Sequence, residues 1–131
     1  YASSGHLPVS FFLVSENKGE AVAVFELFYD LMPVKPDDYE PMMNLLVWQE
    51  EDAWITCIFP RRELRPSCYY AEGDDNILIS PATVEMSGLF VVPLEKDFRK
   101  VTYADLEKVW REVSITEAEK NEIIRKIREK V

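Results

Sequence analysis

The sequence predicts an α+β domain, with a mainly antiparallel sheet of about five strands and helices packed against it. One observation is a set of apolar runs of strand length, each ended by Pro, Gly or an acidic turn. The other is that apolar residues recur at helical spacing in most of the remaining chain. The expected strands lie at residues 9–14, 44–48, 54–59, 77–79 and 88–92.

The N-terminal part reads as a strand followed by an amphipathic helix. Residues 9–14 are apolar and rich in β-forming residues. Asn17 has Glu20 three positions later, which is the spacing of a capping box. Apolar residues then recur at helical spacing over 21–32, and Pro33 ends the pattern.

Two consecutive strand runs predict a β-hairpin. Residues 44–48 and 54–59 are separated by the acidic stretch 49–52, which suits a loop of about four residues. Trp48 and Trp54 flank this turn, and the pattern suggests that they pair across it. Pro60 should mark a strand end, because Pro cannot donate a hydrogen bond to a β ladder.

The C-terminal part predicts helices after the last two strand runs. Residues 95–99 suit one helical turn. Thr102 and Asp105 suit the cap of a helix whose apolar side includes Trp110, so we expect Trp110 to be largely buried. Thr116 and Glu119 suit the start of the last helix.

Length and charge limit the class of protein. A chain of 131 residues is expected to be one domain, residues 1–131. A domain of this length buries about two thirds of the surface that its unfolded chain exposes, so its core needs no metal or disulfide. A net charge of −9 argues against general binding to nucleic acid or to a membrane surface. No run approaches the roughly 20 apolar residues that span a bilayer. The start has neither Met nor a signal-peptide pattern, so we expect a piece of a longer cytoplasmic protein.

Cysteine, histidine and glycine usage excludes several kinds of site. Cys57 is expected to be a small core residue and Cys68 a free thiol, since two cysteines make no disulfide framework. The single histidine, His6, leaves no His-x-His-x-His nucleophile motif and no His-rich metal site in this chain. Four glycines leave little room for a glycine-built phosphate loop. We therefore expect no metal and no cofactor.

The basic turn Arg61, Arg62 and Arg65 is the best candidate for chemistry. Arginine presents a rigid fork that matches phosphate oxygens, and three arginines within five positions would attract a polyanion. The alternative is structural pairing with Glu63, with Glu72 or with the aspartates near position 75.

Three further residues are candidates, each with a structural alternative. Tyr70 could stack on a base or pack in the core together with Tyr69. Glu85 could act as a general acid or base if partly buried, or be a turn carboxylate. Asn44 could bond a ligand or a neighbouring backbone group.

Several short runs resemble the C-terminal part of the GDP-hexose phosphorylases. They are Ser80-Pro81-Ala82-Thr83-Val84-Glu85-Met86-Ser87-Gly88, Asp97-Phe98, Arg111-Glu112-Val113-Ser114, Phe59-Pro60 and Cys68-Tyr69. Asn44-Leu45-Leu46 and Phe59-Pro60-Arg61 are also similar to runs of the diadenosine tetraphosphate phosphorylases. Both families belong, with galactose-1-phosphate uridylyltransferase, to the histidine-triad-like superfamily.

The resemblance implies a histidine-triad-like fold and a nucleotidyltransferase or nucleotide-sugar phosphorylase. In such enzymes a histidine of an N-terminal His-x-His-x-His motif attacks the α-phosphate and carries the nucleotidyl group. This chain would then be a substrate-supporting C-terminal domain, inactive alone, with an N-terminal catalytic domain as its partner and a nucleotide sugar or dinucleotide as substrate. Leu89 stands where the phosphorylases often have His, so the substrate stays open. The alternative is a non-catalytic binding or regulatory module with the same fold.

Overall fold

The computed structural model describes residues 2–3 and 8–130. The described part contains one antiparallel sheet with the strand order β1-β2-β4-β3. β1 (Ala2–Ser3) is only two residues long, and the longer strands are β2 (Ser10–Ser15), β3 (Met43–Glu50) and β4 (Ala53–Pro60). The α+β class is therefore confirmed, with fewer strands than the expected five.

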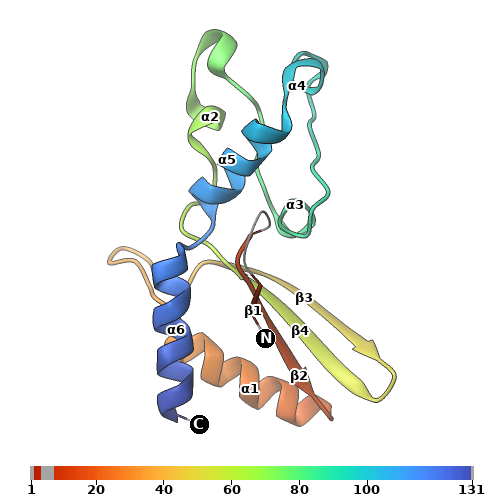
Figure 1. The fold of residues 1–131 in the computed structure, drawn as a ribbon, viewed down its shortest axis with the longest axis vertical. Helices are drawn as coiled ribbons and strands as arrows, with labels where there is room; N and C mark the ends of the chain where they lie inside the picture. Colours follow the sequence, from red (N-terminus) through yellow and green to blue (C-terminus); the bar gives the residue numbers. More distant parts are fainter. Residues whose placement is uncertain (1, 4–7, 131) are drawn as a thin grey trace.

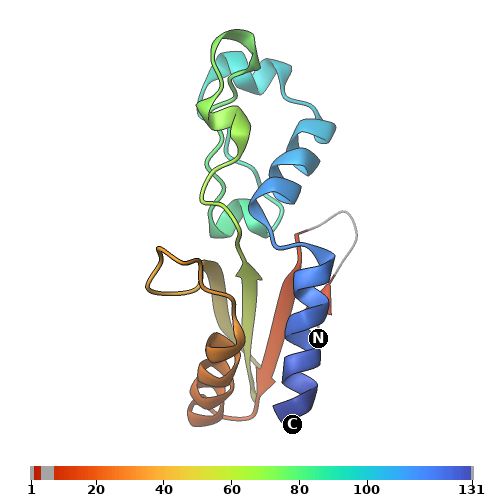
Figure 2. The same cartoon turned by 90° about the vertical axis from the view of Figure 1, so that its left-hand side faces the viewer.

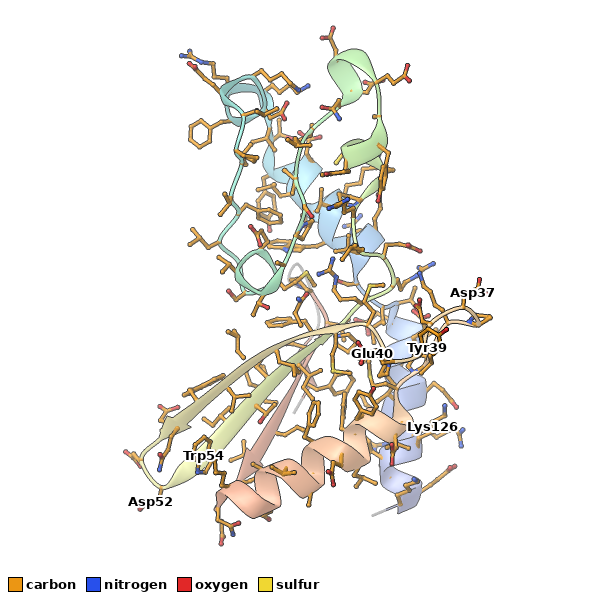
Figure 3. The ribbon with its side chains drawn as sticks, turned by 180° about the vertical axis from the view of Figure 1, so that it is seen from behind. Asp37, Tyr39, Glu40, Asp52, Trp54 and Lys126 are labelled. Atoms are coloured by element: carbon orange, nitrogen blue, oxygen red, sulfur yellow. The ribbon has the colours of Figure 1, made fainter. Side chains whose placement is uncertain are left out.

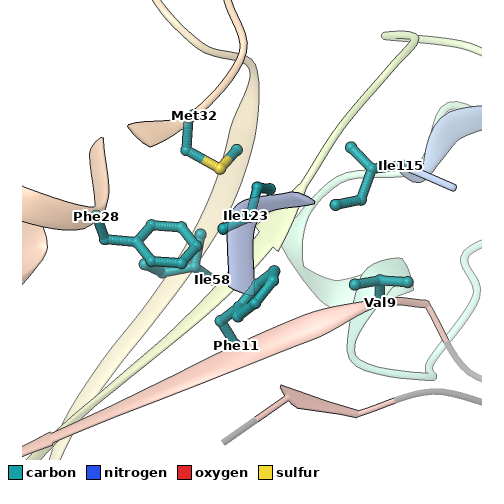
Figure 4. Packing of buried hydrophobic residues seen from close by; sticks show 7 residues of the cluster. All are labelled: Val9, Phe11, Phe28, Met32, Ile58, Ile115 and Ile123. Carbon is teal, nitrogen blue, oxygen red and sulfur yellow. The ribbon is translucent and has the colours of Figure 1, made fainter. Parts of the chain in front are cut away.

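Two helices cover one face of this sheet. α1 (Lys18–Leu31) follows β2, and its cap is as predicted, because Asn17 Oδ1 accepts a hydrogen bond from Glu20 N at 3.0 Å. α6 (Glu117–Lys130) ends the described chain and lies beside α1 (Figures 1 and 2). The main core lies between these helices and the sheet, as Figure 4 shows. Its buried members are Val9, Phe11, Phe28, Met32, Ile58, Ile115 and Ile123.

The hairpin between β3 and β4 is tighter than predicted. Its loop has two residues, Glu51 and Asp52, and Glu51 takes a left-handed conformation with φ of 52°. Trp48 is opposite Ile55, whereas Trp54 is opposite Gln49. Because side chains alternate between faces, the two tryptophans lie on opposite faces, and their expected pairing is wrong.

The rest of the chain, residues 61–116, forms a second layer above the end of the sheet (Figure 1). α5 (Tyr103–Val113) runs through this layer, and four short helices surround it. They are α2 (Ser67–Tyr70), η1 (Gly73–Asp75), α3 (Thr83–Met86) and α4 (Glu95–Lys100). Trp110 of α5 is 6% exposed, so its predicted burial is confirmed.

The two predicted strands at 77–79 and 88–92 are wrong, because neither stretch has a partner strand. Around the first, the Leu78 N–H donates to Asp97 Oδ2 at 2.8 Å and the Ile77 N–H to the Cys68 carbonyl. In the second stretch, exposed and partly buried side chains still alternate: Phe90 packs against the buried clusters around α5, and Leu89 is exposed. Both apolar runs pack against α5 instead of entering the sheet.

Candidate functional site

The six candidate residues from the sequence separate into two groups in the structure. Arg61 belongs to the first group and is only 6% exposed. It is the first residue after β4, where its backbone forms an isolated bridge with Ser114 beyond the end of α5. Its guanidinium therefore lies at the junction between the sheet and the helical layer.

Every N–H of the Arg61 guanidinium has an acceptor within the chain. Nε donates to the Val113 carbonyl at 3.3 Å, and Nη1 donates to Asn44 Oδ1 and to the Pro81 carbonyl. Nη2 donates to the carbonyls of Glu63 and Leu64 at 3.0 and 2.9 Å. A guanidinium has five donors, so none remains for a phosphate.

Asn44 and Glu85 complete this first group. Asn44 lies in β3 and accepts from Arg61, while Glu85 Oε2 accepts from the Ala82 N–H at 2.9 Å at the start of α3. Burial lowers the pKa of Arg61, and the nearby Glu85 carboxylate opposes that shift. These contacts hold the hairpin, the α3 loop and the end of α5 together.

The second group lines a surface pocket of about 480 Å³ between the basic turn and α5. We call it the arginine pocket. Its lining residues are Arg62, Glu63, Arg65, Ser67, Tyr70, Arg111 and Glu112. Half of the predicted site, namely Arg62, Arg65 and Tyr70, is thus brought together with a further arginine.

Arg65 is positioned by an aromatic ring and a hydroxyl. Its guanidinium lies 4.3 Å from the centre of the Tyr69 ring, and its Nε donates to Ser80 Oγ at 3.2 Å. Tyr69 in turn contacts Tyr70 edge to face at 5.1 Å between ring centres. The Tyr69 ring covers one face of the guanidinium. The terminal Nη groups of Arg65 have no hydrogen-bond acceptor among residues 8–130.

The other two arginines of the pocket have no side-chain partner within the described part of the chain. The Arg62 backbone N–H donates to the Val113 carbonyl at 2.8 Å, which fixes the backbone while the side chain points to solvent. Arg111 is exposed on α5. Both guanidinium groups can therefore bind an anion without losing an internal contact.

Both carboxylates of the arginine pocket already have partners. Glu63 pairs with Lys35 at 3.2 Å. Glu112 accepts from Ser67 N at 2.6 Å and from Ser67 Oγ at 2.9 Å, with Lys108 3.9 Å away. The arginines outnumber these acids, so the pocket is a positive spot on an acidic protein.

The sequence analysis missed Arg111 as a site residue. Arg111 is about fifty positions from the basic turn and joins it only because α5 packs beside α2 (Figure 1). An outward-facing arginine near a helix end is typical of any protein surface, so only its place in a run that resembles the phosphorylases sets Arg111 apart in the sequence. His6 lies outside the described residues. Within 8–130 no cluster of His, Cys, Asp or Glu could hold a metal ion.

A comparison with family models found a match. The model described as "GDPGP1-like, C-terminal domain" matches residues 40–131. Neither a search of curated proteins nor a search of solved structures returned a match. No helix in the described residues is long and apolar enough to cross a membrane. The resemblance to the C-terminal part of GDP-hexose phosphorylases is confirmed: the chain belongs to the GDPGP1-like C-terminal domain family.

Proposed function

We propose that this chain is the substrate-supporting C-terminal domain of a nucleotide-sugar phosphorylase, and that the arginine pocket binds phosphates of the substrate. The observation that carries the proposal is the contrast between the arginines. Every guanidinium N–H of Arg61 donates to an acceptor within the chain. Arg62, Arg65 and Arg111 instead line one pocket and have guanidinium N–H groups without an acceptor in the described part of the chain. Membership of the GDPGP1-like family supports a GDP-hexose as the substrate class.

The chemistry of the pocket fits the phosphates of a nucleotide sugar. A guanidinium stays charged at any physiological pH and can bond two phosphate oxygens at once. Tyr70 is 66% exposed and lines the same pocket, so its ring is accessible to a base. The pocket would thus hold the substrate and contribute no nucleophile.

The nucleophile is expected from the N-terminal domain. This chain has one histidine, whereas the enzymes that it resembles use a His-x-His-x-His motif. We therefore expect no phosphorolysis by residues 1–131 alone, and activity only in the full-length protein.

The test is steady-state phosphorolysis of a GDP-hexose by the full-length protein and its alanine variants. Arg62→Ala, Arg65→Ala and Arg111→Ala each remove a charged donor worth about 1.5–3 kcal/mol, so kcat/KM should fall by roughly ten- to a hundred-fold. Arg99→Ala is the matched control, because Arg99 is an exposed arginine of α4 paired with Glu95 outside the pocket. Melting curves check that every variant is folded.

Unchanged kinetics in all three pocket variants would contradict phosphate binding at this pocket. A full-length protein that binds GDP-hexose through these arginines without turnover would instead support the regulatory module. A loss with Arg99→Ala as large as with Arg62→Ala would show a general effect of charge.

A further inference from the structure

β3 is an edge strand with an open side. It pairs with β4, and no described strand lies on its other side. The Arg61 N–H donates to the Met42 carbonyl at 2.8 Å, and bonded pairs alternate with unbonded pairs along an antiparallel ladder. The N–H and C=O groups of Leu45 and Val47 therefore point away from β4, toward the open side.

This edge lacks the features that normally protect one. Natural edge strands are kept short, bulged or charged, or carry Pro or Lys. β3 has eight residues without Pro, Lys or Arg, and its only carboxylate is Glu50 at the end. Leu45, Leu46, Val47 and Trp48 are consecutive and all exposed.

The apolar surface continues from the edge onto the face of the sheet away from α1 and α6. Leu46 and Trp48 are opposite Cys57 and Ile55, and Val14 is opposite Ile55 on the other side. α3 covers this face only near the helical layer, through Met86. Val14 is 54% exposed, Trp48 38% and Leu46 37%. Leu45 and Val47 lie on the other face, the one that α1 and α6 cover, since they are opposite Ile58 and Thr56. We call Val14, Leu46, Trp48 and Ile55, together with Leu45 and Val47 along the edge, the β3 surface.

Both ends of the β3 surface are acidic (Figure 3). Asp37, Asp38 and Glu40 precede the strand. At the hairpin end, carboxylates line a hollow of about 500 Å³, with Lys18 nearby over the Trp54 ring. These carboxylates are Glu16, Glu20, Glu50, Glu51 and Asp52.

Charge disfavours a second copy of the chain as the partner. An antiparallel pair of β3 strands would place residues 50–52 of one copy beside 37–40 of the other. A parallel pair would place the two hairpin tips together. Like charges meet in both arrangements, so the surface suits a strand with basic residues beside its ends.

The family boundary indicates where such a strand comes from. The C-terminal domain model begins at residue 40, but β2 and α1 precede that point and supply Phe11 and Phe28 to the core. β2 adds to β4, so the sequence before the matched region already contributes a strand to one side of the hairpin. The other side of the hairpin, along β3, has no partner among the described strands.

We propose that β3 is completed by a β-strand of the N-terminal domain of the same protein, added along Leu45 and Val47. That strand places apolar side chains over the β3 surface and carries Lys or Arg beside its ends. Main-chain hydrogen bonds supply the affinity, and the apolar contacts fix the register. The proposal rests on the family and on the edge geometry, and is independent of the arginine pocket.

The test is residue-resolved amide hydrogen exchange on the full-length protein. Leu46 is an internal reference, since its N–H faces β4, whereas the Val47 N–H faces the open side. The proposal predicts that Val47 exchanges as slowly as Leu46 and that dilution changes neither rate. Fast exchange at Val47 beside slow exchange at Leu46 would overturn it. So would protection at Val47 that disappears on dilution, because a second copy would then be the partner.

A matched pair of variants tests the surface independently. Val47→Lys and Val91→Lys each replace an exposed valine, at 55% and 57% exposure, but only Val47 belongs to the β3 surface. In the full-length protein Val47→Lys should speed exchange at Leu45 while Leu46 stays protected, and Val91→Lys should change neither. Equal behaviour of the two variants would contradict the proposal. If Val47→Lys fails to fold, the wild-type exchange rates still decide.

Discussion

Neighbouring arginines have different roles because the chain turns between them. Arg61 ends the β4 ladder and points into the junction, where Asn44 and four carbonyls take its donors. Arg62 is exposed, and only its backbone is fixed. Sequence alone assigned phosphate contact or ion pairing to the basic turn as a whole. The structure shows that burial, which side-chain type does not reveal, separates the two residues.

Replacing Arg61 should destabilise the protein, whereas replacing Arg62 should not. Arg61→Ala leaves Asn44 Oδ1 and several carbonyls without their donor, so the free energy of unfolding should fall by at least about 1–3 kcal/mol. Arg61→Lys should recover only part of this, because an ammonium has three donors and no fork. Arg62→Ala should stay within about 0.5 kcal/mol of wild type. Urea unfolding measures all three, and a stable Arg61→Ala variant would contradict the structural role.

The buried carboxylate of Asp97 should make the free energy of unfolding depend on pH in the acid range. Burial alone would raise the pKa of Asp97, but hydrogen bonds from the Lys96 ammonium at 2.7 Å and the Leu78 N–H at 2.8 Å outweigh it and lower the pKa below its usual value. The ionised group therefore stabilises the fold above the unfolded pKa, and this contribution is lost as the pH falls through the lower folded pKa.

Wild type should accordingly exceed Asp97→Asn in unfolding free energy at about pH 7, and the difference should shrink below about pH 4. Urea unfolding across this range is the measurement. A difference that stays constant with pH would exclude Asp97 as its source.

The two cysteines should differ in reactivity. Cys57 is buried in β4, and burial raises its pKa to about 11. Cys68 is half-buried, and its pKa is raised by burial and by Glu112. Because the thiolate is the reactive form, a thiol reagent should label Cys68 first and Cys57 only on unfolding. Peptide mass mapping of the labelled native protein checks this, and early labelling of Cys57 would contradict its burial.

At the scale of elements, local signals predicted the longer helices and the existence of the hairpin, but not the short helices α2, η1 and α3 or the length of the hairpin loop. The caps at Asn17 and Thr102 are present, since each side-chain oxygen accepts an N–H three residues on. A cap needs only nearby residues, whereas a strand needs a partner that a single sequence does not identify. The runs 77–79 and 88–92 have strand-like composition but pack on α5, where Phe90 lies 5.0 Å from Trp110 between ring centres.

Trp110 is the side chain that joins α5 to the α3 loop. Its Nε1 donates to the Glu85 carbonyl at 3.0 Å, and its ring packs in the cluster with Cys57 and Met86. Trp110→Ala should lower the free energy of unfolding by about 3–5 kcal/mol. Trp110→Phe should cost less, since it keeps most of the packing and loses the N–H. Thermal melting compares them with Phe98→Ala, an exposed aromatic on α4. Equal melting of Trp110→Ala and Phe98→Ala would contradict this role.

At the scale of the whole molecule, the sheet with α1 and α6 supports a helical layer that carries the arginine pocket. The sequence identified the basic turn and Tyr70 but not Arg111, because the pocket forms only when α5 returns beside α2. It identified Asn44 and Glu85 but did not place them near Arg61, because the buried junction depends on how the two layers meet. The family match makes residues 40–131 of this assembly a C-terminal domain.

Nuclear magnetic resonance of the arginine side chains in the full-length protein tests the central claim most directly. Titration with a GDP-hexose should shift the Nε signals of Arg62, Arg65 and Arg111 with one common affinity, because all three line one phosphate-binding pocket. Arg99 and the buried Arg61 should stay unchanged. Saturating shifts at the three pocket arginines alone are the result that the account predicts. Binding that leaves these three signals in place, or that moves Arg99 equally, would contradict it.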